Sequence, residues 1–168
     1  IAVPQLSPKQ VEKLSWDLES AQVQVDSQVS HRVYAETSGS VHLCQIVLRA
    51  LWEEATSSRS PIGIAEVDRV IDKLVANASQ IPHFTTIFQS ITSDPGMLAA
   101  FKQFAEGGPP DAGVLQDLVL TGVCDAENPF LCNVYERVFG PTGPLDLRRA
   151  WVDAQRGGGD NQPSQRTP

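Results

Sequence analysis

The sequence lacks the short motifs that identify most nucleotide-binding, metal-dependent and hydrolytic proteins. It contains no glycine-rich phosphate loop, no H-E-x-x-H pair, no G-x-S-x-G element and no C-x-x-C pair. The paired E-x-x-H motifs of a di-iron bundle are also missing. No phenylalanine precedes Phe84, which argues against a globin-like haem pocket. We therefore expect no catalytic activity, no metal and no cofactor.

Long apolar runs and an excess of positive charge are missing as well. No run approaches the roughly 20 apolar residues that a membrane-spanning helix needs, so no span is predicted. The 13 Lys and Arg residues stand against 20 Asp and Glu residues, which gives a formal charge of −7. Because nucleic acids and anionic membranes attract positively charged proteins, this balance disfavours both as partners.

The two ends of the sequence also lack common features. The sequence begins at Ile1 without a methionine, and no basic stretch followed by an apolar core marks a signal peptide. Removal of a signal or transit peptide, release from a larger precursor and trimming of the chain would each explain this start. At the other end, 157–168 has no apolar residue that could anchor it, so we expect a flexible tail.

Cysteine is scarce, with three residues in the chain. Cys124 and Cys132 enclose a short loop, which a disulfide closes if the two Cα atoms approach to about 4.4–6.8 Å. We expect this bridge; two reduced thiols in a cytosolic protein are the alternative. Cys44 lies in the apolar run 41–52 and is expected to be a buried free thiol, with an intermolecular bridge as the lesser option. The bridge and the missing methionine together favour an exported or lumenal location.

What the sequence does contain is a helical repeat of apolar residues. Spacings of three and four predict a long helix over 8–36, a second over 41–55, and a third from Ile64 to the break at Pro82. Over 84–91 the spacing is helical, but the β-branched residues there leave a strand as an alternative.

Shorter helices are predicted in the remainder of the chain. Asp94-Pro95 and Asn128-Pro129 are each expected to open one, since Asp and Asn cap helices and proline suits the first turn. Another helix is expected before Gly122, and a last one over 145–155. The predicted fold is therefore all-α. A single helical bundle over 1–156, with three longer N-terminal helices and several short C-terminal ones, precedes the tail.

All six phenylalanines lie in the C-terminal half. Aromatic side chains commonly fill the irregular space between short helices. We expect this use here, although short helices around aromatics can also leave a cavity for a lipid or pigment.

Few residues in the sequence are candidates for binding a metal ion. His31, His42 and His83 have no spacing that would let two of them share a metal with a cysteine, so we expect surface or turn positions for them. The loop 125–128 gathers three oxygen-bearing side chains, but it lacks the alternating spacing and the glycine of a calcium loop. We expect a solvated loop whose last residue caps a helix.

One triplet matches a modification signal. Asn77-Ala78-Ser79 fits the N-glycosylation acceptor pattern; the alternative is a set of ordinary polar residues at a helix end.

Together these observations predict a non-catalytic, exported or lumenal helical protein that acts by binding another macromolecule. The expected partner is another protein or a second copy of the chain. A structural subunit, such as a coat or filament protein or an extrinsic subunit of a larger complex, is the first alternative. A small enzyme or a carrier of a small hydrophobic ligand is the second.

Overall fold

Every regular element of the computed structural model is a helix within the residues it describes, which are 5–15, 18 and 22–157. Two isolated bridges, Gln5–Ser40 and Val25–Ile62, pair extended segments, and these ranges contain no β-strand. The all-α prediction is confirmed. Among the described helices none is long and apolar enough to cross a lipid bilayer. The predicted tail lies outside the described residues, apart from Gly157.

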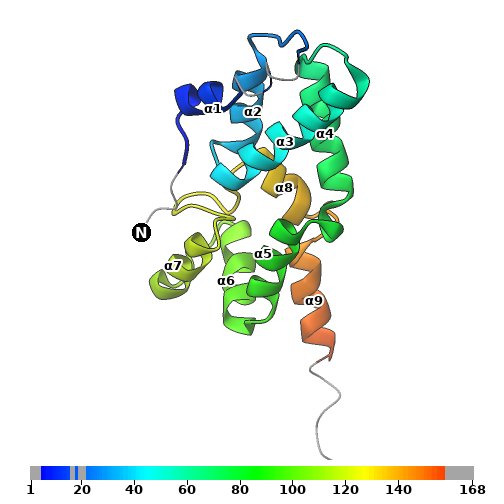
Figure 1. Ribbon diagram of the computed structural model, residues 1–168. Coiled ribbons are helices and arrows are strands. Elements are labelled where there is room, and N and C mark those ends of the chain that lie inside the picture. Colours follow the sequence, from blue (N-terminus) through cyan, green and yellow to red (C-terminus); the bar gives the residue numbers. More distant parts are fainter. Residues whose placement is uncertain (1–4, 16–17, 19–21, 158–168) are drawn as a thin grey trace, which may run out of the picture.

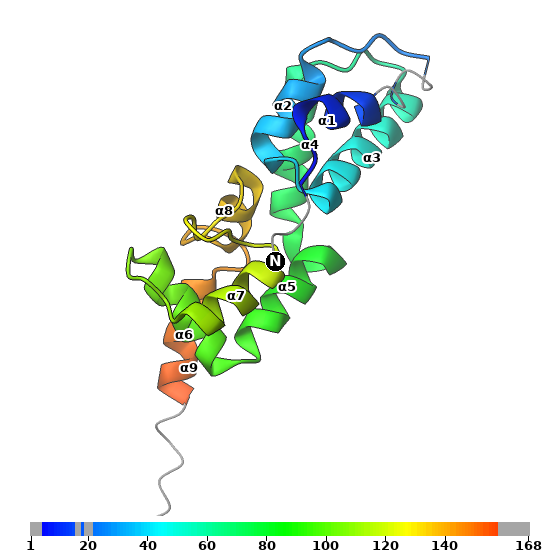
Figure 2. The ribbon, with the colours of Figure 1, turned by 90° about the vertical axis from the view of Figure 1, so that its left-hand side faces the viewer.

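The first half of the molecule is formed by four helices. They are α1 (Pro8–Ser15), α2 (Val29–Thr37), α3 (Val41–Ser58) and α4 (Ile64–Ala76). In this half α2 packs against α1, α3 and α4 (Figures 1 and 2). Helices α3 and α4 confirm the helices expected over 41–55 and from Ile64, and α3 is longer than predicted by one turn.

The prediction of a single long helix over 8–36 is wrong, because α1 and α2 are separate helices. Between them Gln22 has a φ of 57°, which interrupts a right-handed helix. The chain is then extended and pairs with a distant segment. The Asp26 amide donates to the Ile62 carbonyl over 2.8 Å, and the Ile62 amide donates to the Gln24 carbonyl over 2.8 Å. Local spacing of apolar residues does not report such a long-range pairing.

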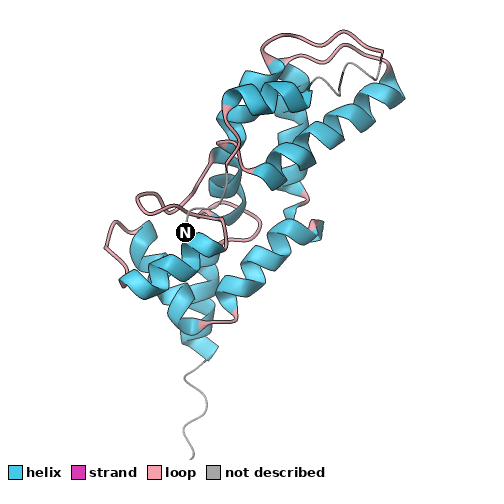
Figure 3. Ribbon diagram, turned by 60° about the vertical axis from the view of Figure 1, so that its left-hand side comes forward, coloured by secondary structure: helices cyan, strands magenta, loops and turns pink. Residues whose placement is uncertain are grey.

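The second half follows a short connection, the 3₁₀ helix η2 (Ala78–Gln80). It contains α5 (Pro82–Thr92), α6 (Pro95–Ala105), α7 (Ala112–Leu120) and α9 (Leu147–Gly157), as Figure 3 shows from a further side. Helix α5 resolves the helix–strand alternative over 84–91 in favour of the helix. Asp94 caps α6 as expected, because its carboxylate accepts from the Gly96 amide over 2.8 Å.

Helix α8 (Asn133–Phe139) joins the two halves. It packs against α2 and α4 of the first half, and Phe84 of α5 contacts its aromatic face. The Phe84 ring meets Phe139 edge-on at 6.2 Å between centroids and meets Tyr135 at 6.4 Å. Phe84, Phe101 and Phe139 are fully buried, so these three fill the core as predicted.

The turn between α2 and α3 depends on Gly39. Gly39 has a φ of 72°, and its carbonyl accepts from the Leu6 amide over 2.7 Å, which fixes the segment that leads into α1. A Cβ at this position would overlap the Leu6 carbonyl oxygen. Gly107 has a φ of 84°, but a Cβ there would meet open space.

We therefore expect Gly39→Ala to lower the free energy of unfolding by about 2–3 kcal/mol, through left-handed strain and the clash together. Gly107→Ala is the matched control and is expected to cost about 1 kcal/mol, because only the strain applies. Urea unfolding of the two variants beside the wild-type chain measures both values. Equal losses in the two variants would contradict this account.

Candidate functional site

Helix α7 (Ala112–Leu120) is short, and most of its apolar side chains are at least partly exposed. Asp111 caps it by accepting from the Gly113 amide over 2.9 Å. Its sequence is AGVLQDLVL, yet Leu118 is its only buried residue. Leu120 is 52 % exposed. Because an amphipathic helix normally turns its apolar side chains to the core, α7 presents apolar surface that the described part of the chain leaves exposed.

The loop that follows α7 is held in a defined shape. The Asp125 carboxylate accepts from the Glu127 and Asn128 amides, each over 2.7 Å. The Leu131 amide donates to the Val123 carbonyl over 2.8 Å and closes the loop. Partial burial acts to raise the pKa of Asp125, but the hydrogen bonds that this carboxylate accepts outweigh it and the pKa is lowered. Asp125 therefore keeps its negative charge at neutral pH.

Between α7 and this loop lies a groove of about 610 Å³, which we call the α7 groove. Leu115, Val119 and Leu131 line it with half-buried apolar side chains. Gln116 and Glu127 are exposed lining residues. An apolar hollow with a polar border is the form of a site that receives an apolar side chain from another molecule.

The α7 groove lies in a segment without positive charge. No Lys or Arg occurs between Lys102 and Arg137. Among the acidic residues there, only Glu106 forms an ion pair with a described basic residue. The carboxylates in this segment that no described basic residue neutralises are those of Asp111, Asp117, Asp125, Glu127 and Glu136.

The predicted Cys124–Cys132 disulfide is not present. Cys44, Cys124 and Cys132 are all buried free thiols. Burial raises the pKa of Cys124 to about 12, to which the charge of Asp125 contributes. Burial also raises the pKa of Cys132 to about 12. Each thiol has its own buried environment: Cys124 lines the α7 groove, whereas Cys132 precedes α8, and the charge of Glu36 adds to the rise in its pKa. The prediction of a buried thiol at Cys44 is confirmed.

The prediction that the last residue of the loop 125–128 caps a helix is wrong. Asn128 does not cap a helix, because α8 begins at Asn133 and Asn128 is instead bound to Asp125.

Asn77 is exposed just after α4, and its side-chain amide donates to the Lys73 carbonyl over 2.8 Å. Ser79 is also exposed. Ala78 between them is fully buried, and glycosylation of the triplet stays a prediction.

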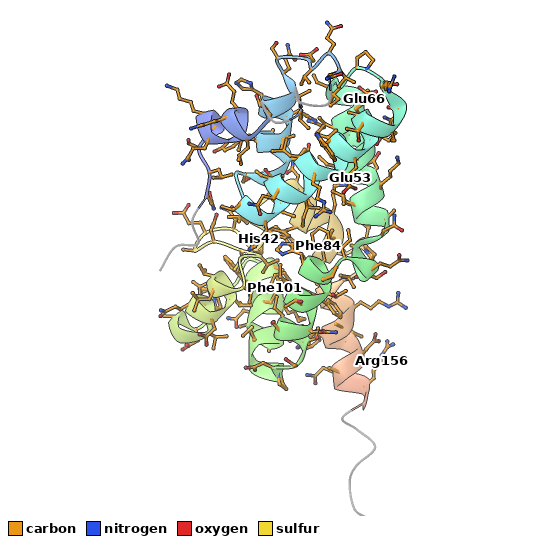
Figure 4. The ribbon with its side chains drawn as sticks, viewed as in Figure 1. His42, Glu53, Glu66, Phe84, Phe101 and Arg156 are labelled. Carbon is orange, nitrogen blue, oxygen red and sulfur yellow. The ribbon has the colours of Figure 1, made fainter. Side chains whose placement is uncertain are left out.

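A second hollow of about 560 Å³ lies where the two halves meet, and we call it the junction cleft. Figure 4 shows His42 and Phe84 close together in this middle part of the molecule. The His83 Nε2 atom is 2.9 Å from the Tyr135 hydroxyl, and the His42 and His83 rings lie 5.4 Å apart. The cleft has no Asp, Glu, Lys or Arg among its described lining residues, which include Ser40, His42, His83, Thr86, Leu120 and Tyr135.

The buried groups of the junction cleft are neutral. Burial lowers the pKa of His83 to about 4, and the neighbouring His42 contributes to this shift. Burial raises the pKa of Tyr135, and the side chain of Ser40 opposes that rise. The imidazole and the phenol therefore form an uncharged hydrogen-bonded pair at neutral pH, which ties α5 to α8.

No pattern in the sequence indicates this pair. His83 was expected in a turn, but it lies in the first turn of α5. Its partner is 52 residues away along the chain, so no local pattern connects them. The α7 groove did leave a signal in the sequence, namely the interval between Lys102 and Arg137 without a basic residue.

No group of three or more His, Cys, Asp or Glu side chains in the described part of the chain is arranged to hold a metal ion. Comparison of the chain with models of known protein families, with curated proteins and with solved structures gives no match.

Proposed function

We propose that the protein acts without catalysis, by binding a basic amphipathic segment of another protein in the α7 groove. The observation that carries this proposal is the combination of a half-buried apolar lining with carboxylates that no described basic residue pairs with. An apolar side chain of the partner would leave water on entering the groove, at roughly 25 cal/mol per Å² of buried apolar surface. Lys or Arg residues beside it would meet the free carboxylates, which adds specificity and a faster association.

The junction cleft supports a binding role less well. Its buried imidazole and phenol already satisfy one another, and its lining is uncharged. Of the two carboxylates that line the α7 groove, that of Glu127 remains available to a partner, while that of Asp125 is bound within its own loop.

The proposal includes an exported or lumenal location, for which the Cys124–Cys132 disulfide no longer counts as support. The exposed Asn77 side chain would be the candidate for glycosylation in such a compartment.

A labelled synthetic helix built of leucine and lysine, with one apolar face, is the probe that tests this function. We expect it to bind the full chain, and a leucine–glutamate helix with the same apolar face not to bind. Glu127→Lys is expected to weaken the binding about tenfold, or about 1.4 kcal/mol. About 1 M salt should weaken it as well, because the screening length there is about 3 Å. Fluorescence anisotropy measures the dissociation constants.

Glu53→Lys is the matched control. It changes the net charge equally, but Glu53 lies on α3, well away from α7, as comparison of Figures 1 and 4 shows. Its exposed ion pair with Arg49 contributes at most about 0.5 kcal/mol to stability. Equal binding of both helices, or equal weakening by both substitutions, would refute the proposed function.

A further inference from the structure

The chain itself carries a surface that matches the partner expected at the α7 groove. This surface is on α9, where Arg149, Val152 and Arg156 follow one another at intervals of three and four and therefore share one face. Val152 is 38 % exposed, and both arginines are exposed. No described carboxylate forms an ion pair with either arginine. We call this surface the α9 face. Its acidic neighbours are Asp153 and Asp146, and the Asp146 carboxylate accepts from the Arg149 amide over 3.1 Å.

The rest of α9 holds the helix to its own chain. Leu147 is fully buried, and the Lys102 ammonium lies 4.6 Å from the centre of the Trp151 ring. Arg148 pairs with Glu106 over 3.4 Å. These contacts hold α9 in place, and they leave the two arginines of the α9 face exposed. Figure 4 shows Arg156 near the far end of α9.

We propose that the α9 face of one copy docks into the α7 groove of a second copy. This inference rests on the proposed function, because it names the partner of that same groove. Val152 would enter the apolar part of the groove, and Arg149 and Arg156 would meet carboxylates such as Glu127. The complementarity is specific in sign: the groove segment has acidic residues and no basic ones, while the α9 face carries two arginines.

The placement of the two surfaces determines the form of the assembly. Helix α6 packs against both α7 and α9, and Figure 1 shows α7 and α9 on opposite sides of α5 and α6. One copy cannot bring its own two surfaces together. A contact between two different surfaces is heterologous, so it continues from copy to copy unless the rotation closes a ring. This geometry agrees with the structural-subunit alternative, since each added copy leaves one free surface of each kind.

Sedimentation equilibrium of the full chain at low ionic strength tests this inference. We expect the mean mass to rise with concentration, and about 1 M salt to return it to the monomer. The double variant Arg149→Glu with Arg156→Glu should stay monomeric alone, because its groove and its α9 face are then both acidic. The variant Glu127→Lys should assemble about tenfold more weakly alone, because its new lysine faces two arginines. Mixing the two variants should restore assembly, because the unchanged groove of the double variant then meets the unchanged α9 face of the Glu127→Lys variant.

A monomer at all concentrations, or variants that assemble like the wild-type chain, would overturn the inference. If the wild-type chain stays monomeric while the leucine–lysine helix still binds, the inference fails and the proposed function stands. If neither self-assembly nor peptide binding occurs, both fail.

Discussion

Acidification from pH 7 to pH 4 is expected to lower the free energy of unfolding by at most about 3 kcal/mol through His83, because solvent still screens its half-buried ring in part. The folded chain holds the pKa of His83 at about 4, whereas the ordinary value is 6.5. In the unfolded chain the imidazole therefore takes up its proton near pH 6.5, before the folded chain does. Between these values the unfolded state binds more protons, so stability falls as the pH falls, by about 1.4 kcal/mol for each unit of difference.

His83→Gln isolates this effect, since glutamine keeps a hydrogen-bonding group near Tyr135 but does not titrate in this range. We expect the variant to be less stable than the wild-type chain at pH 7 and to lose less stability between pH 6.5 and pH 4. Asp125 and Glu106, whose pKa values are lowered, weaken the fold in acid in both proteins and cancel in the comparison. Urea unfolding at a series of pH values gives the two curves. Parallel curves would show that His83 titrates normally in the folded chain.

Phe84→Ala is expected to cost about 3–5 kcal/mol, the range for deleting a fully buried aromatic side chain. Phe84 contacts His83, Tyr135 and Phe139, so its removal leaves a void where α5 meets α8. The cavity adds to the lost burial because the surrounding rings close around it only in part. Thermal and urea unfolding measure the loss.

Phe88→Ala is the control on the same helix. Its side chain is only half-buried, so we expect roughly half of the Phe84 effect. If Phe84→Ala does not fold, Phe84→Leu keeps the comparison possible, with an expected cost of about 1–2 kcal/mol. A loss at Phe84 no larger than that at Phe88 would mean that the contact between α5 and α8 contributes little to stability.

Helices were predictable here where local signals agreed. The apolar spacing from Val41 and from Ile64 marked α3 and α4, and Asp94-Pro95 marked the start of α6. The same spacing failed between α1 and α2, because the pairing of Asp26 with Ile62 is a long-range contact.

The candidate site was less predictable than the fold, because it depends on how separate segments meet. The α7 groove needs both the helix and the loop after it, and the spacing of two cysteines there suggested a disulfide that the structure does not contain. The hydrogen bond between His83 and Tyr135 joins α5 and α8, and its two residues are 52 positions apart in the sequence. Of the features of the site, only the absence of Lys and Arg between Lys102 and Arg137 can be seen in the sequence, because it does not depend on which segments meet.

The interval without lysine or arginine also affects how the molecule can be mapped. A protease that cuts after basic residues leaves α7, its loop and the start of α8 on one peptide, 103–137. Amine-reactive labels find no lysine side chain in that peptide. Footprinting of the groove therefore calls for carboxylate-directed reagents, which would modify the very groups that we assign to partner recognition.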